Sequence, residues 1–163
     1  MIAQEYSIGF VFNDKMTQVL LIKKEHGPKC VVGRWNGIGG HIEYDETPKE
    51  CQVREFEEET GVHVPEKEWH QFTKLQGDDF IVHCFWSRSS FAVLNARTVT
   101  DEKVEIINTK ATGNQHIYNM PLAPNLTWMI PFLMDRTTHN HLCVVLATYR
   151  KDDNLDADSA TII

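Results

Sequence analysis

The sequence predicts an α/β (α+β) fold, in which helices pack against a mixed β-sheet. Several short runs are rich in β-branched and aromatic residues, as strands are. Only two segments have a clear helical pattern, and they do not alternate strictly with the strands. The 163 residues suit one domain with a substantial core. We expect that domain to span residues 1–150 and residues 151–163 to form a flexible C-terminal tail.

The first part of the chain predicts a pair of strands followed by a loop. Tyr6–Phe12 is a β-rich run, and a turn at residues 13–15 separates it from a second strand, Val19–Ile22, with which it can pair. Glu25–Trp35 is polar and contains glycine and proline, so it reads as a loop. The Gly39-Gly40 pair then interrupts what would otherwise be a short strand through Ile42.

Thr47–Thr60 is the strongest predicted helix. Thr47 can cap its N-terminus, Pro48 suits the first helical position, and Glu50 completes a capping box. Gly61 can end the helix in a left-handed conformation. Helical spacing places three residues on one face, which should pack on the sheet. These are Val53, Phe56 and Thr60.

The second half of the chain predicts further strands and one more helix. The strands are expected at Trp69–Leu75, Phe80–Phe91 and Val104–Ile107. Leu126–Met134 predicts a helix with Asn125 as a possible cap, although Pro131 inside it leaves its start open. Leu142–Tyr149 is a last apolar stretch, either strand or helix.

Composition excludes several classes of function. The formal net charge is −7, which argues against a partner of duplex nucleic acid but not against a nucleotide, because bound metal inverts the local charge. No apolar run approaches the roughly 20 residues that span a membrane, and no secretory signal precedes Tyr6. The four cysteines have no CxxC spacing, which disfavours a zinc site and favours reduced thiols in the cytoplasm.

A cluster of glutamates on the first predicted helix indicates a metal site. Glu55, Glu58 and Glu59 share one helix face by spacing, and Arg54 is the one positive charge beside them. Carboxylates this close repel one another, and a divalent cation would turn that repulsion into coordination. The alternative is an ordinary acidic surface helix.

The segment from Gly40 to Val62 resembles the box of the Nudix family, G-x5-E-x7-R-E-U-x-E-E-x-G-U, where U is a bulky apolar residue. Every specified position is met: Gly40, Glu46, Arg54, Glu55, Phe56, Glu58, Glu59, Gly61 and Val62. So specific a match identifies the chain as a member of that family. The resemblance implies an α/β/α sandwich around a mixed sheet, over roughly residues 6–149.

The same resemblance implies a catalytic metal centre. Glu55, Glu58 and Glu59 would bind Mg²⁺, or Mn²⁺ in its place, together with the backbone carbonyl of Gly39. Arg54 would orient the carboxylates through salt bridges. A general base or further metal ligand often comes from a loop after the box. Residues 100–105 occupy that place, with Glu102 the first candidate and Glu105 the second. The alternative for both is a solvated turn.

Substrate signals are weaker. Nudix enzymes cleave nucleoside diphosphates linked to another group, and residues 34–40 resemble the approach to the box in MutT-type members. There the residue matching Asn36 contacts the base; the alternative is a turn residue beside Gly37. Asn125 lies in a segment resembling their later base-binding stretch, in which an aspartate is common. Trp128 either stacks on the base or packs in the core. Lys24, or else Lys23, would reach the phosphates.

These observations predict a small-molecule partner, a (deoxy)nucleoside triphosphate that is cleaved to the monophosphate and pyrophosphate. The ADP-ribose type carries a proline about 16 residues after the box, where this chain has Gly77-Asp78-Asp79. The alternatives are a nucleotide sugar or dinucleoside polyphosphate as substrate, or a catalytically silent module that binds nucleotide. Nothing in the sequence indicates an oligomeric state.

Overall fold

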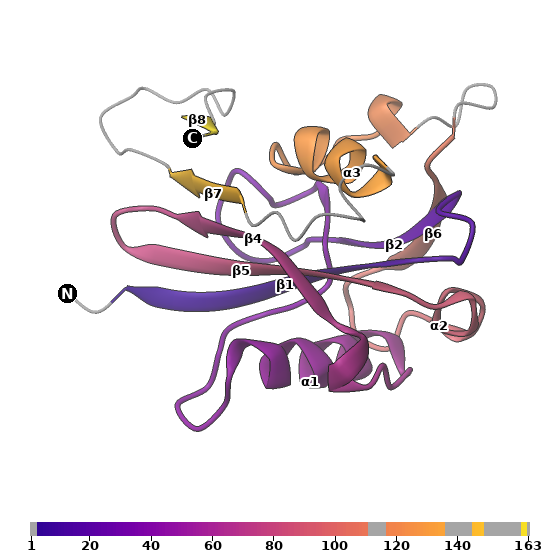
Figure 1. Ribbon diagram of the computed structural model, residues 1–163, viewed down its shortest axis with the longest axis horizontal. Coiled ribbons are helices and arrows are strands. Elements are labelled where there is room, and N and C mark those ends of the chain that lie inside the picture. Colours follow the sequence, from indigo (N-terminus) through magenta and orange to yellow (C-terminus); the bar gives the residue numbers. More distant parts are fainter. Residues whose placement is uncertain (1–2, 111–116, 136–144, 149–160, 163) are drawn as a thin grey trace.

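A mixed β-sheet forms the middle layer of the protein, with helices on both faces (Figure 1). The computed structural model describes residues 3–110, 117–135, 145–148 and 161–162. Its strands are β1 (Gln4–Phe12), β2 (Gln18–Lys23), β3 (Trp35–Asn36), β4 (His70–Gln76), β5 (Phe80–Arg88), β6 (Val104–Asn108), β7 (Val145–Thr148) and β8 (Thr161–Ile162). Its helices are α1 (Pro48–Thr60), α2 (Ser90–Asn95) and α3 (Leu126–Met134), with 3₁₀ turns η1 (Glu66–Glu68) and η2 (Ile117–Asn119).

The described strands pair in the order β3-β2-β1-β5-β4-β7-β8, and β6 pairs with β2 outside that path. The β1–β5 and β4–β7 pairs are parallel, and the other pairs are antiparallel. Helix α1 lies on one face of this sheet and α3 on the other (Figure 1). The predicted α/β/α sandwich around a mixed sheet is therefore confirmed. Within the described residues, no helix has the length and apolar character needed to cross a membrane.

Helix α1 has the bounds and caps that the sequence predicts. The Thr47 hydroxyl accepts the Glu50 N–H at 3.2 Å, and the Glu50 carboxylate accepts the Thr47 N–H at 2.7 Å. Gly61 ends the helix with φ 72°. Phe56 and Thr60 are buried and Val53 is partly buried, so the predicted face does pack on the sheet.

The predicted strands differ by one to three residues at their ends, and at two of these ends a helical turn replaces the expected strand. The strand expected at Phe80–Phe91 stops at Arg88, because the Ser89 hydroxyl accepts the Ala92 N–H at 3.1 Å and caps α2. Trp69 precedes β4 rather than starting it, and it ends the η1 turn with its ring fully buried. In both places, an apolar run that looks like a strand belongs to a helical turn packed on the sheet.

The C-terminal predictions fall partly outside the described residues. Of the apolar stretch at Leu142–Tyr149, residues 145–148 form β7, and the others are not described. Of the expected tail, Thr161–Ile162 pairs with β7 as β8, and residues 151–160 and 163 lie outside the described part.

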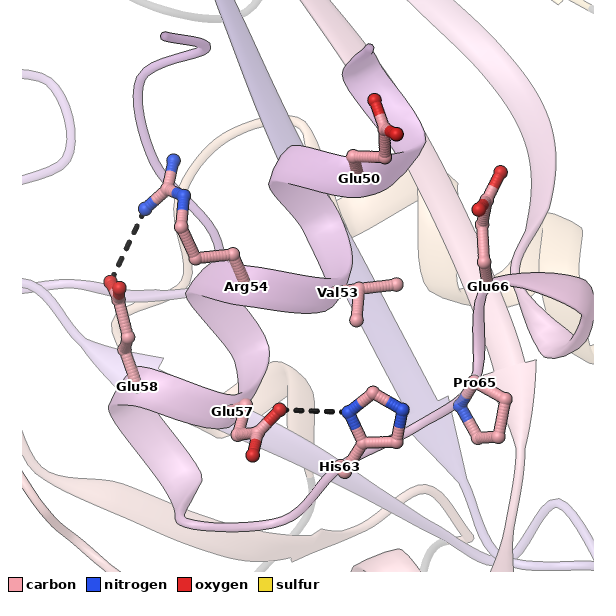
Figure 2. Close-up of a pocket in the computed structure, with 8 residues that line it drawn as sticks. All are labelled: Glu50, Val53, Arg54, Glu57, Glu58, His63, Pro65 and Glu66. Atoms are coloured by element: carbon pink, nitrogen blue, oxygen red, sulfur yellow. Dashed lines mark hydrogen bonds and ion pairs between the residues drawn. The ribbon is translucent and has the colours of Figure 1, made fainter. Parts of the chain in front are cut away.

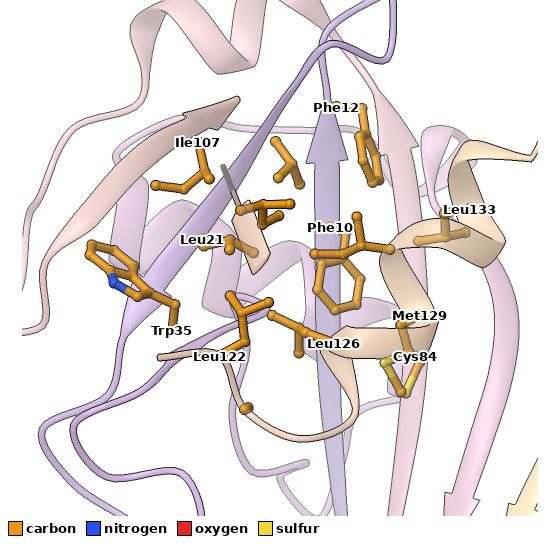
Figure 3. Packing of buried hydrophobic residues seen from close by; sticks show 14 of the residues in the cluster. Phe10, Phe12, Leu21, Trp35, Cys84, Ile107, Leu122, Leu126, Met129 and Leu133 are labelled. Atoms are coloured by element: carbon orange, nitrogen blue, oxygen red, sulfur yellow. The ribbon is translucent and has the colours of Figure 1, made fainter. Parts of the chain in front are cut away.

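The sheet separates two hydrophobic cores. On the α1 face, side chains from β1 and β2 pack against Phe56 and Trp69. On the α3 face, Phe10 and Leu21 from the sheet meet Met129 of α3 (Figure 3). Helix α3 begins at Leu126 as predicted, with no capping hydrogen bond from the Asn125 side chain at its start, and it accommodates Pro131 in its interior.

Candidate functional site

The glycine pair before α1 lies in a narrow space between β1 and the helix. The Gly9 N–H donates to the Ile38 carbonyl at 2.8 Å, and the Ser7 N–H donates to the Gly40 carbonyl at 2.9 Å. A Cβ on Gly39 would lie 2.2 Å from the Ser7 carbonyl oxygen, and one on Gly40 would lie 2.5 Å from a Glu55 carboxylate oxygen. A side chain at position 39 would therefore clash with the β1 backbone, and one at position 40 would displace the Glu55 carboxylate.

Two of the box glutamates face this loop. Glu59 is buried, and its carboxylate accepts the Gly39 N–H at 3.2 Å, while the Glu55 carboxylate packs against Gly40. Burial raises the pKa of Glu59 to about 7; nearby Lys24 opposes that rise, and the negative charge of Glu55 adds to it. Glu58 differs from both, because its side chain is 57% exposed.

Arg54 links the carboxylates of this region. Its guanidinium contacts Glu46 at 2.5 and 3.0 Å, Glu55 at 2.8 Å and Glu58 at 3.2 Å. The hydrogen bonds from Arg54 lower the pKa of Glu46 to about 2, and Glu46 in turn raises the pKa of Arg54. Arg54 therefore holds three carboxylates of the box in one network, and a fourth contact joins it to the His41 carbonyl at 3.2 Å.

Lys24 and Glu102 extend the site from the sheet side. The Lys24 ammonium forms an ion pair with Glu102 and lies 3.9 Å from a Glu59 oxygen. The other oxygen of the buried Glu102 carboxylate accepts the N–H groups of Glu25 at 2.8 Å and His26 at 3.2 Å. Burial alone would raise the pKa of Glu102, but Lys24 and these N–H groups bring it below its ordinary value.

Glu105, the second candidate for a base, has different surroundings. It lies on β6 opposite Leu21 and forms an ion pair with Lys103. Of the two, Glu102 is the residue that the Lys24 ammonium connects to Glu59.

The predicted base-contacting residues come from segments that are tied together. The Trp35 N–H donates to the Pro121 carbonyl and the Ala123 N–H donates to the Trp35 carbonyl, both at 2.8 Å. These bonds join β3, which contains Asn36, to the segment that leads into Asn125. The Asn36 side chain accepts the Gly37 N–H at 2.9 Å, although the backbone of Asn36 pairs with Ile22 of β2 and does not form a turn.

Trp128 belongs to the same side of the molecule. Its partly buried ring packs against the α3-face core, as the core interpretation expects. Its indole N–H is buried and has no hydrogen-bond partner among the described residues.

Sequence reasoning missed Gln52. This polar residue of α1 is fully buried on the side of the helix that faces the sheet, and its amide donates to the Ile38 carbonyl at 3.0 Å. It occupies an unspecified position of the box, and only its i, i+7 spacing to Glu59 places it on the face that meets the loop.

A hollow of about 680 Å³ lies on the outer side of α1. Figure 2 shows Arg54 directed toward Glu58 and Glu57 directed toward His63 along its wall. The hollow shares Arg54 and Glu58 with the carboxylate network, but Glu59 and Gly39 do not line it. It therefore lies beside the carboxylates that face the glycine loop.

The donor set fits a divalent cation. In the part of the chain that the structure describes, no three His, Cys, Asp or Glu side chains already converge as a metal-binding group. Two cationic side chains instead form ion pairs with the carboxylates. Lys24 lies between Glu59 and Glu102, and Arg54 contacts Glu55 and Glu58. Carboxylate oxygens are ligands that Mg²⁺ prefers, and a bound Mg²⁺ would take over the charge neutralisation that Lys24 and Arg54 supply here.

Comparison with known proteins establishes the family. The model of the NUDIX domain matches residues 4–113, and the chain belongs to the Nudix family. Members of this family are generally pyrophosphohydrolases that use divalent metal ions.

Solved structures show the same fold. The MutT mutator protein of Bacillus halodurans superposes with a TM-score of 0.70 at 18% identity, covering 98% of this chain and 97% of that one. A Nudix hydrolase from Nitrosomonas europaea gives 0.66 at 15% identity, over 93% and 81% of the two chains. An ADP-ribose pyrophosphatase from Streptococcus suis gives 0.59 at 14% identity, over 88% and 98%. One of these neighbours is named for ADP-ribose and the other two are not, and at these identities the shared fold does not define the substrate of this chain.

Proposed function

We propose that the protein is a metal-dependent pyrophosphohydrolase that cleaves a (deoxy)nucleoside triphosphate to the monophosphate and pyrophosphate. The observation that carries this proposal is the buried Glu59 carboxylate, which accepts the Gly39 N–H and lies 3.9 Å from the Lys24 ammonium that pairs with Glu102. Carboxylates confined in this way, on a box that specifies the family, suit phosphoanhydride hydrolysis better than a solvated acidic surface.

The reaction adds one water across a phosphoanhydride. The water oxygen bonds to one phosphorus, the bridging P–O bond between the α- and β-phosphates breaks, and a proton passes to a base. Glu55, Glu58, Glu59 and the Gly39 carbonyl would hold Mg²⁺ or Mn²⁺. Such an ion neutralises charge on phosphate oxygens and lowers the pKa of a bound water. Arg54 orients the carboxylates, since it already contacts Glu55 and Glu58.

Glu102 is supported over Glu105 as the proton acceptor or further ligand because Lys24 connects it to Glu59, whereas Glu105 pairs with Lys103. Both of its oxygens already accept hydrogen bonds, so it must give up one of these to take a proton. Replacing Glu102 with Gln keeps the size and removes the proton-accepting charge. We expect kcat to fall by about 100-fold or more, in line with loss of a general base. A Glu105→Gln variant serves as the control.

Three further residues are proposed to bind the substrate. Asn36 and Asn125 come from segments that backbone hydrogen bonds hold together, which suits two contacts to one nucleobase. Lys24 is supported over Lys23 because its ammonium lies among the site carboxylates, where triphosphate oxygens would arrive with the metal. The described cysteines, Cys30, Cys51 and Cys84, are free thiols, which supports a cytoplasmic location.

A hydrolysis panel tests the proposal. Ribo- and deoxyribonucleoside triphosphates, nucleotide sugars and dinucleoside polyphosphates are incubated with Mg²⁺ or Mn²⁺, and phosphate and pyrophosphate are measured. We expect metal-dependent release of pyrophosphate from a triphosphate. A preference for a sugar nucleotide or dinucleoside polyphosphate over every triphosphate would contradict the proposed substrate. Nucleotide binding without turnover across the panel would favour a silent module.

A further inference from the structure

Gln52 is a polar side chain buried in an apolar interface. It projects from α1 toward β1, is fully buried, and donates from Nε2 to the Ile38 carbonyl at 3.0 Å. Its other polar atom, Oε1, is buried and has no hydrogen-bond partner in the described part of the chain. Burying an unpaired carbonyl oxygen costs stability. The packing of α1 alone gives no reason for an amide at this position.

The sheet is shaped to admit this side chain. Gly9 lies directly beneath Gln52, and a Cβ on Gly9 would lie 2.2 Å from the Gln52 Nε2 atom and 2.6 Å from the Trp69 ring. Nor does the Ile38 carbonyl depend on Gln52, because it already accepts the Gly9 N–H at 2.8 Å. The Ile38 carbonyl therefore already has a hydrogen-bond partner, and the second hydrogen bond, from Gln52, restrains the direction in which the carbonyl points.

The Ile38 carbonyl and the Gly39 N–H belong to the same peptide group. That group is planar, so fixing the direction of the carbonyl also fixes the direction of the N–H. The Gly39 N–H donates to Glu59 at 3.2 Å, and the Ile38 carbonyl accepts the hydrogen bond from the Gln52 amide. Residues 52 and 59 are seven apart on α1 and share one face, so one helix holds both ends of this peptide.

We propose that Gln52 is a positioning residue, which holds the Ile38–Gly39 peptide so that its N–H meets Glu59 and thereby sets the metal-binding geometry. The expected effect of Gln52 on metal affinity rests on the proposed function, whereas its effect on the orientation of the Ile38–Gly39 peptide does not. Groups that orient a metal ligand without touching the metal typically change metal affinity by about 10- to 100-fold when removed.

Replacing Gln52 with Met tests this, because Met keeps the volume and removes both polar atoms. We expect the thermal midpoint to stay level or rise, since the unpaired oxygen is gone while Gly9 still satisfies Ile38. We also expect the Gly39 amide to exchange at least about tenfold faster in metal-free protein by NMR, relative to core amides of β1. The Mn²⁺ dissociation constant, measured by electron paramagnetic resonance, should rise at least about tenfold.

Phe56→Leu is the matched control, because it loosens the same core without removing a hydrogen bond to the loop. It should lower the thermal midpoint and leave relative Gly39 exchange and Mn²⁺ affinity close to the wild-type values. Gln52→Leu replaces Gln52→Met if the latter is insoluble.

Unchanged Gly39 exchange in the Gln52 variant would overturn the proposal, and so would a lower midpoint with unchanged Mn²⁺ affinity. If the wild-type protein binds no Mn²⁺ and hydrolyses no nucleotide, the proposed function fails, and Gly39 exchange alone then decides whether Gln52 positions the peptide.

Discussion

The two faces of the sheet are built differently. The α1 face buries polar groups, among them Gln52, Glu59 and Thr60, each at a defined place in the interface. The α3 face has a larger apolar cluster, in which Phe10 and Met129 meet, and the buried indole N–H of Trp128 lies against it (Figure 3). Apolar cores tolerate repacking when volume is kept, whereas buried polar networks depend on each partner.

The proposed functions of the two faces also differ. The proposed chemistry lies with the carboxylates on the α1 side, and the proposed base contacts, Asn36 and Asn125, lie on segments bound to each other near α3. The loop from Asn36 to Gly40 connects the two. Variants on the α1 side should therefore change kcat, and variants on the α3 side should change KM.

Among variants of α1, the largest effect is expected from Glu59→Gln. It removes the charge that faces the glycine loop while keeping the size of the side chain, and kcat should fall by about 100-fold or more. Glu57→Gln is the control, because Glu57 lies on the same helix but is exposed and paired with His63 at 2.7 Å. Pyrophosphate release from a triphosphate measures both. Equal losses in the two variants would break the comparison.

Asn36→Ala should have a smaller effect, and of a different kind. Loss of one amide contact to the base is expected to raise KM about tenfold, or about 1.4 kcal/mol of binding, with little change in kcat. Asn95→Ala, at the exposed end of α2, is a suitable control. A drop in kcat with unchanged KM would place Asn36 with the chemistry rather than with the base.

Glu46 is expected to affect the stability of the fold rather than the kinetics. Its folded-state pKa is lowered to about 2 from 4.5, chiefly by hydrogen bonds from Arg54. The stabilisation is therefore present above pH 4.5 and is lost as the pH falls toward 2. Because Arg54 is partly exposed, we expect Glu46→Gln to lower the free energy of unfolding at pH 7 by about 1–2 kcal/mol.

Denaturant unfolding at pH 7, 4.5 and 2.5 checks this prediction. The difference between wild type and Glu46→Gln should shrink with falling pH, whereas the exposed Glu66→Gln control should differ little from wild type at any pH. A constant difference at all three values would show that Arg54 does not act through the charge of Glu46.

The ends of α1 could be predicted because they depend on residues that are close together in the sequence. The capping box at the start of α1 and Gly61 at its end each act within about one turn of the helix. Their local patterns therefore define the two helix ends directly. The end of β5 was predicted less well, because the Ser89 cap competes with an apolar run that continues to Phe91.

Long-range contacts explain what the sequence could not supply. Lys24 meets Glu102 across 78 positions of the chain, and no local pattern pairs them. Gln52 acquires its role only because β1 places Gly9 beneath it. The family box identified the carboxylates, but their neighbours depend on how the sheet is assembled.

The central claim is that the α1 carboxylates facing Gly39 form the metal site, and a Mn²⁺ titration tests it most directly. Electron paramagnetic resonance would measure the dissociation constant for wild type, Glu59→Gln and Glu57→Gln. We predict that Glu59→Gln raises this constant at least about tenfold and that Glu57→Gln leaves it unchanged. The same constant in all three proteins would contradict the account.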